Sequence, residues 1–298
     1  MNQNQAIKRL NELYKKSPLA EDEEFEYTEI LAYLIEETKN THYMVELGGF
    51  YYERRVFDKA LKYYEMAYAY GNEWVSEGLG YIWYYGRTGE VDYEKAFHYY
   101  SKAAELGNLR SKIKVADMYK NGYYVEKDYA KYTEIIEESK HLVENARYLN
   151  EPFPEIYTRL ARIRKEQKRY EEAADLYLQA KNFLAERLLY THFFGDRNVM
   201  KWLTEDLYTI IPFNETDFDL FDLYYLLKNP ITVTFRYESR KYTVRSTETE
   251  EGTAVEFAGR WFRTIDDFFA KAVINGKVLT DYYRDLYAFE VIHEKNDM

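Results

Sequence analysis

The sequence repeats a set of landmark residues at one fixed spacing, and this period limits the possible folds more than any other feature. The pairs that lie 36 residues apart are Lys59 and Lys95, Gly71 and Gly107, Gly86 and Gly122, Asp92 and Asp128, and Lys95 and Lys131. Several landmarks at one period of this length are typical of stacked helical repeats. The spacing therefore predicts a solenoid of helical hairpins.

Each repeat is expected to contain two helices joined by a turn. The expected helix pairs are 43–53 with 57–70, 74–85 with 93–105, and 109–121 with a helix that begins at Tyr129. A small residue recurs in the first helices, at Gly48, Gly80 and Ala116. Because a glycine inside a helix costs about 1 kcal/mol relative to alanine, its presence indicates close approach of the second helix of the same repeat.

The second repeat carries a recognisable order of residues. Residues 79–107 contain Leu-Gly, an Ile-Trp pair, a turn glycine, Asp92, Lys-Ala, two tyrosines, and Ala-Ala before a closing glycine. This order resembles the Sel1-like repeat, a family within the tetratricopeptide-like superfamily. Repeat one has Arg54 and Arg55 where the pattern has a turn glycine, and repeat three has Val115-Ala116 for Leu-Gly. The resemblance covers residues 41–137 and implies an α-solenoid that binds other proteins.

The rest of the chain is assigned by its hydrophobic period. Residues 1–40 are expected to form N-terminal capping helices, and residues 41–228 a Sel1-like and tetratricopeptide-like α-solenoid. The further helices expected in this solenoid are 156–165, 169–181, 183–191, 199–210 and 217–227. At Asn229 the period changes from 3.6 to 2, which predicts strands, so residues 229–298 are expected to form a small module. The expected fold class is mainly α, an α-α superhelix with a small C-terminal α+β module.

Composition excludes several classes of function. The 298 residues include no cysteine, so disulfides, cysteine-based zinc sites and thiol catalysis are excluded. The formal net charge of −11 disfavours nonspecific binding to nucleic acid or to an anionic membrane. The first residues lack a signal-peptide pattern, and no apolar run reaches the roughly 18 residues that span a bilayer. We therefore expect a cytoplasmic protein.

Residues that could carry out chemistry have simpler structural explanations. Asp266 and Asp267 resemble a catalytic carboxylate pair. They follow Thr264, an expected helix cap, and at that position their negative charges would interact favourably with the helix dipole. The acids in 217–222 lack the glycine and the distal glutamate of a calcium loop. No phosphate-binding or hydrolase motif is present. We expect no enzyme activity, no cofactor and no metal.

Candidate binding residues lie between the packing positions of the first helices, which the resemblance places on the concave side of the solenoid. The predicted protein-binding residues are Tyr52, Glu77, Tyr81, Tyr84, Asp117 and Lys120. Tyrosine is a frequent binding hot spot because it buries a large area with few rotatable bonds. The alternative is that these tyrosines pack between repeats, and the sequence leaves both open. A possible second contact is the basic hairpin of Arg236, Arg240, Lys241 and Arg245, whose alternative role is a solvated surface.

The predicted function is that of a non-enzymatic scaffold or adaptor that binds another protein, with the solenoid groove and the C-terminal module as contacts. The acidic balance favours a partner with a basic surface, and a narrower version is an immunity, anti-phage or counter-defence inhibitor. The rival hypothesis is an enzyme whose site lies in or beside the C-terminal module. A pocket there with converging charges of perturbed pKa would favour the enzyme, and a tyrosine-rich groove would favour the scaffold.

Overall fold

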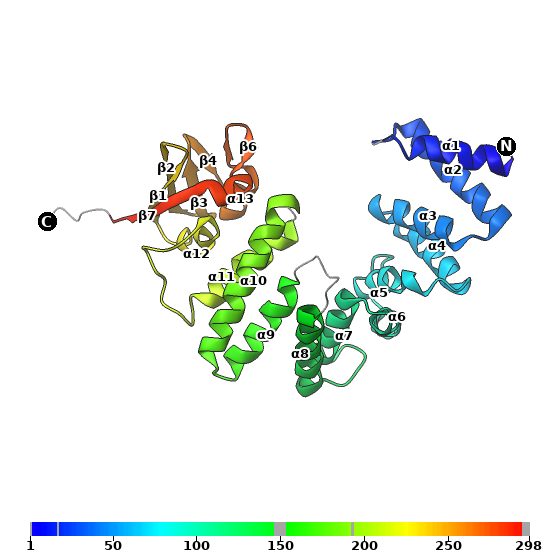
Figure 1. The fold of residues 1–298 in the computed structure, drawn as a ribbon, viewed down its shortest axis with the longest axis horizontal. Helices are drawn as coiled ribbons and strands as arrows, with labels where there is room; N and C mark the ends of the chain where they lie inside the picture. Colours follow the sequence, from blue (N-terminus) through cyan, green and yellow to red (C-terminus); the bar gives the residue numbers. More distant parts are fainter. Residues whose placement is uncertain (1, 17, 146–152, 192–193, 294–298) are drawn as a thin grey trace. The chain divides into compact units, whose positions relative to one another are not determined.

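The computed structural model describes residues 2–16, 18–145, 153–191 and 194–293 (Figure 1). The chain forms two compact units, Met1–Ser139 and Lys140–Met298. The first unit is helical, and consecutive helices from α1 to α7 pack on one another. Its elements are α1 (Gln3–Leu13), α2 (Glu21–Thr38), α3 (Thr41–Glu53), α4 (Phe57–Ala69), the 3₁₀ turn η1 (Glu73–Val75), α5 (Ser76–Tyr84), α6 (Tyr93–Glu105), α7 (Leu109–Asn121) and α8 (Tyr129–Asn145).

The landmark aspartates of the 36-residue period begin the second helices. Asp92 accepts a hydrogen bond from the backbone N–H of Lys95 at 3.0 Å, and Asp128 accepts one from Lys131 at 2.8 Å. The Lys95 ammonium also lies 3.8 Å from the centroid of the Trp83 ring. The repeated residues therefore act at the joint between the two helices of a hairpin, and the predicted helical hairpins are confirmed.

The glycines of the first helices make room for tyrosines of the second helices. A Cβ atom at Gly80 would lie 2.6 Å from Cδ1 of Tyr100 in α6, and a Cβ atom at Gly48 would lie 2.6 Å from Cδ1 of Tyr64 in α4. Real Cβ atoms do not approach another atom so closely, so an alanine at either position forces the ring to move. The close approach predicted from Gly48 and Gly80 is confirmed, and it occurs within each repeat.

The second unit begins with helices and continues into a sheet. Its helical elements are α9 (Pro154–Glu166), α10 (Tyr170–Thr191), α11 (Phe194–Leu207), η2 (Leu220–Asp222), α12 (Leu223–Leu226), α13 (Ile265–Lys271) and η3 (Leu279–Asp285). The two helices expected at 169–181 and 183–191 are one helix, because Asn182 is exposed and nothing at that point interrupts the backbone hydrogen bonds. The helix expected at 217–227 is also wrong in extent, since Asp219 caps a 3₁₀ turn and only α12 follows it.

The strands form one main antiparallel sheet and one small hairpin. The strands are β1 (Ile231–Tyr237), β2 (Arg240–Thr249), β3 (Gly252–Phe257), β4 (Arg260–Phe262), β5 (Val273–Ile274), β6 (Lys277–Val278) and β7 (Leu286–Ile292). The main sheet has the order β4-β3-β2-β1-β7, so the last strand pairs with the first. Phe235 lies opposite Tyr242 and Val233 opposite Val244, which places the apolar side chains of both strands on one face.

One hydrophobic core joins this sheet to the helices before it. Val233 and Phe235 of the sheet share a core with Leu188 of α10 and Tyr224 of α12. The ring of Tyr224 stacks on that of Phe269 in α13, with centroids 3.8 Å apart. The change of period at residue 229 therefore marks a change from helix to strand inside one compact unit, and it does not separate two cores.

Candidate functional site

Helices α3, α4 and α5 and the turn η1 line a cavity of about 440 Å³. Its lining residues are Val45, Tyr52, Tyr64, Trp74, Val75, Glu77, Gly78 and Tyr81. Three of them, Tyr52, Glu77 and Tyr81, belong to the predicted binding residues. We call this site the aromatic cavity, because four of its lining residues carry aromatic rings.

The rings of the aromatic cavity are held by close packing. The rings of Tyr52 and Tyr81 have centroids 6.1 Å apart and meet edge to face, at 78°. Tyr64 fits between two glycines, since Cβ atoms at Gly48 and Gly78 would lie 2.6 and 3.0 Å from its ring. Burial raises the pKa of Tyr64 to about 12, so its phenol is neutral at physiological pH.

Trp74 stands at this cavity with little cover. It belongs to η1, and its side chain is 74% exposed. The backbone N–H of Trp74 donates to Oδ1 of Asn72 at 3.2 Å, which fixes the turn that carries the ring. Sequence reasoning missed Trp74 because it placed this residue at the start of a helix, and it assigned no role to Tyr64. The signal available in the sequence was the pair of helical glycines, Gly48 and Gly78, that lie against the Tyr64 ring in the folded chain.

Tyr84 has a different environment from Tyr81, although the two are three residues apart. Its ring contacts those of Tyr93, Tyr100 and Tyr123, with centroids 5.6 to 6.1 Å away. Burial raises the pKa of Tyr84, and the charge of Asp117 adds to the shift. The aromatic cavity is lined by Tyr81 and not by Tyr84, whose contacts are those of a residue that packs between helices.

The remaining predicted binding residues lie on α7, the next first helix. The Lys120 ammonium lies 5.1 Å from the centroid of the Tyr132 ring in α8. Neither Asp117 nor Lys120 lines the aromatic cavity. The structure thus brings Tyr52, Glu77 and Tyr81 together and leaves Tyr84, Asp117 and Lys120 outside that group.

In the described part of the chain, two further cavities are larger than the aromatic cavity, and charged residues that line them form ion pairs with one another. One of about 790 Å³ is lined by residues of α4 and α6, and its Lys95 pairs with Asp92 at 3.2 Å. The other, of about 740 Å³, lies in the second unit, where Asp206 pairs with Arg162 at 2.9 Å and Lys165 at 3.1 Å.

The basic residues of the predicted second contact are exposed on the β1–β2 hairpin. Arg236 lies opposite Lys241 in the register, so both side chains project from the face that carries no core residues. Acidic side chains of β7 and β3 meet two of the cations: Lys241 pairs with Glu290 and Arg245 with Glu256, both at 3.4 Å. These residues form a mixed polar surface, and Arg240 lies at the hairpin turn.

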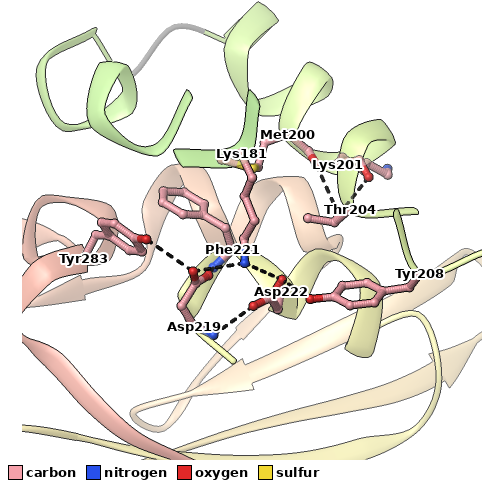
Figure 2. Close-up of polar contacts among 9 residues, drawn as sticks. All are labelled: Lys181, Met200, Lys201, Thr204, Tyr208, Asp219, Phe221, Asp222 and Tyr283. Atoms are coloured by element: carbon pink, nitrogen blue, oxygen red, sulfur yellow. Dashed lines mark hydrogen bonds and ion pairs between the residues drawn. The ribbon is translucent and has the colours of Figure 1, made fainter. Parts of the chain in front are cut away.

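Groups with a perturbed pKa do converge in the second unit, around a buried lysine (Figure 2). The Lys181 ammonium lies 2.6 Å from Oδ1 of Asp222 and 3.0 Å from Oδ2 of Asp219. The hydroxyl of Tyr208 donates to Asp222 at 2.6 Å, and that of Tyr283 donates to Asp219 at 3.2 Å. Figure 2 shows these side chains pointing toward one another from separate elements.

Burial dominates the electrostatics of this cluster. Burial alone would lower the pKa of Lys181, but the charges of Asp219 and Asp222 outweigh it and leave that pKa raised. Burial raises the pKa of Asp222, and the ammonium of Lys181 offsets part of the shift. The ion pairs of Lys181 join α10 to the turn at η2. The residues of the cluster are not among those that line the three cavities described above.

Within the described ranges, no set of three or more His, Asp or Glu side chains is placed to hold a metal ion. Of the helices that the structure describes, none combines the length and the apolar character needed to cross a bilayer.

Comparison with solved structures finds similar helical proteins. One is a protective antigen present in uropathogenic Escherichia coli strains, which displays an SLR fold; it is 21% identical with a TM-score of 0.45. That alignment covers 60% of this chain and 36% of the antigen, so this chain spans about a third of that protein's length. Another is a Sel1 repeat protein from Oxalobacter formigenes, 17% identical with a TM-score of 0.49, aligned over 72% of this chain and 78% of that one.

Comparison at the level of sequence gives a more specific result. No curated protein matches this chain at a significant level. The model of the Sel1 repeat matches residues 43–72, 77–108 and 110–131. These three segments coincide with the hairpins α3–α4 and α5–α6 and with α7 up to the start of α8. Residues 43–72, 77–108 and 110–131 of this chain are therefore three Sel1 repeats.

Proposed function

We propose that this chain is a non-enzymatic scaffold that holds a protein partner at the aromatic cavity. Sel1 repeats generally act as scaffolds for protein–protein interaction. The observation that carries the proposal is the cavity itself, where Trp74 stands 74% exposed beside Tyr52 and Tyr81. Tryptophan and tyrosine in a pocket are the residues that most often dominate binding energy.

The partner is proposed to carry a basic surface. A net charge of −11 supports this, because opposite charge raises the association rate and suppresses wrong partners. The exposed hairpin with Arg236, Arg240, Lys241 and Arg245 is proposed as a second contact, one that would meet acidic groups. The proposed location is the cytoplasm, and a chain without cysteine is compatible with its reducing conditions.

A narrower version of the proposal concerns the biological role. Neutralisation of a basic toxin or effector, as by an immunity, anti-phage or counter-defence protein, would use the same charge complementarity. Its test is to measure the activity of the captured partner with and without this chain. Inhibition of the partner's activity at an equimolar ratio supports this role. Unchanged activity of the partner would support a role as an adaptor instead.

The test of the scaffold is capture of the partner by the intact chain and by matched variants. Tyr81→Ala removes a ring of the aromatic cavity, whereas Tyr190→Ala removes a ring that is 78% exposed on α10. Loss of a hot-spot tyrosine costs about 2 kcal/mol in binding, roughly thirtyfold in Kd. We expect that loss for Tyr81→Ala alone, with both variants folded by circular dichroism. Equal affinity of both variants for the partner would show that the partner does not bind at the aromatic cavity.

A further inference from the structure

We propose that the aromatic cavity binds a cationic side chain, the ammonium of a lysine or the guanidinium of an arginine, presented by the protein partner. This inference rests on the proposed function and specifies the chemistry of the anchor. The cavity volume of about 440 Å³ lies within the range of about 300–1,000 Å³ that ligand pockets have.

The first observation is the composition of the cavity wall. Tyr52, Tyr64, Trp74 and Tyr81 bring four aromatic rings to one cavity. The face of an aromatic ring carries negative electrostatic potential, and a cation within about 6 Å of the ring centroid is attracted to it, most strongly for tryptophan. Walls of this kind favour a cation over an anion.

The second observation is the charge within the wall. Glu77 is the one ionisable acid or base other than tyrosine among the lining residues that the structure describes. Its Oε2 atom accepts a hydrogen bond from Nδ2 of Asn108 at 2.7 Å. In the described part of the chain, no lysine or arginine forms an ion pair with Glu77. A cation in the cavity would be attracted to the carboxylate of Glu77, whereas an anion would be repelled by it. An uncharged group would leave this carboxylate without a counterion.

The third observation is which rings of the cavity wall and of its surroundings already lie near a cation of the chain. The Arg87 guanidinium lies 5.4 Å from the centroid of the Tyr81 ring, and the Lys114 ammonium lies 4.8 Å from that of Tyr84. Lys95 lies over Trp83 at 3.8 Å. Arg87 is not a lining residue of the aromatic cavity, and across the described residues no lysine or arginine covers the ring of Trp74. The chain thus places one of its own cations at Tyr81, a ring of the cavity wall, and others at rings outside the cavity, and it leaves the exposed ring of Trp74 available to a cation from the partner.

The test compares two small probes that differ by the charged group. Nα-acetyl-lysine methylamide keeps the side-chain ammonium, and Nα-acetyl-norleucine methylamide has an apolar side chain without it. The intact protein is titrated with each by ligand-observed NMR, at constant ionic strength. We expect the lysine probe to bind about 2- to 30-fold more tightly than the norleucine probe, which is the range that cation–π contacts give.

Matched variants locate the binding. Trp74→Ala and Glu77→Gln should each weaken the lysine probe by about 2- to 30-fold. The controls are Trp202→Ala, which removes a tryptophan that is 52% exposed in the second unit, and Glu105→Gln, which removes an exposed carboxylate of α6. Both controls should bind the probe as the wild type does. Circular dichroism verifies that each variant folds, and Glu77→Gln keeps the size of the side chain.

Three results would overturn the inference: no binding of the lysine probe, equal binding of both probes, or wild-type affinity in folded Trp74→Ala and Glu77→Gln. These results are separable from failure of the proposed function. If the captured partner depends on Tyr81 but the lysine probe does not compete with it, the cavity binds protein through another group. If the probe binds as expected but the partner is indifferent to Tyr81→Ala, the partner docks elsewhere.

Discussion

Gly80 in α5 and Tyr100 in α6 occupy complementary positions: the ring of Tyr100 lies where the side chain of any larger residue at position 80 would begin. A Cβ atom at Gly80 would be 2.6 Å from Cδ1 of Tyr100. Tyr100 is almost fully buried, so its ring has no solvent-filled space into which it could move. This contact fixes how closely the two helices of the second repeat approach.

Gly80→Ala should therefore destabilise the protein, although alanine is the better helix former. Overpacking a tight contact costs about 1–3 kcal/mol, and helix propensity returns about 1 kcal/mol at most. The control is Gly49→Ala, in another first helix, where a Cβ atom would lie 3.8 Å from the nearest atom outside its own helix. Urea denaturation should show a loss for Gly80→Ala and no loss for Gly49→Ala. Equal stability of the two variants would contradict the packing described for the repeat.

The buried cluster at Lys181 predicts a large effect of a single substitution. Lys181→Met leaves the carboxylate of Asp222, which is 1% exposed, without its cation. Breaking a buried pair in this way costs about 3–5 kcal/mol. Adding Asp222→Leu should recover part of that loss, because it removes the buried unpaired carboxylate, whereas Asp219 also loses Lys181 but has a side chain that is 31% exposed to solvent.

The matched control for this prediction is the exposed pair of Lys271 and Asp267, 2.5 Å apart on α13. Lys271→Met should change stability by no more than about 0.5 kcal/mol. The measurement is thermal denaturation of four proteins: the wild type, Lys181→Met, Lys181→Met with Asp222→Leu, and Lys271→Met. Wild-type stability of Lys181→Met would show that the cluster is not a structural cross-link and would reopen a functional role for its lysine.

Shortening the chain tests where its folding units end. Residues 229–298 share a core with Leu188 and Tyr224, so a fragment of residues 1–228 should expose apolar surface and bind the dye ANS strongly. A fragment of residues 1–145, which ends with α8, keeps the core of the first unit and should unfold cooperatively in urea. If fragment 1–228 bound no more dye than the whole chain, the boundary at residue 229 would separate two independently stable parts.

The pH dependence of stability should include a contribution from Asp206. Burial would raise its pKa, but hydrogen bonds and charge from Arg162 and Lys165 outweigh burial and hold that pKa below its usual range. A carboxyl whose pKa is depressed in the folded state stabilises the fold above its unfolded pKa of about 3.9, and this stabilisation is lost as the pH falls through the folded value.

The measurement is the unfolding free energy of wild type and Asp206→Asn between pH 7 and pH 2. The difference between them should be constant above about pH 5 and should shrink below about pH 4. Asp175→Asn, an exposed position in the same unit, should follow the wild type throughout. A difference that does not vary with pH would mean that the ion pairs of Asp206 contribute nothing to stability.

The sequence by itself determined the repeat architecture, because the residues that define it act locally. Asp92 and Asp128 cap the helices that follow them, and the bounds of α6 and α7 agree with those expected from the pattern. Alternation of apolar residues likewise predicted strand β1, since side chains of a strand alternate between faces whatever the strand pairs with. Gly48 and Gly80 predicted close approach of the second helix of the same repeat, although they did not identify the tyrosines that make the contact.

Only the tertiary structure decided which residues come together. Tyr81 and Tyr84 have the same local signal, yet Tyr81 lines the aromatic cavity and Tyr84 packs against rings of α6 and of the segment after α7. Lys181 and Asp222 are 41 residues apart, and no local pattern predicts that burial will pair them. Helix caps and periodicity arise from interactions within a few residues, whereas cavities, shared cores and buried ion pairs depend on which distant surfaces exclude water together.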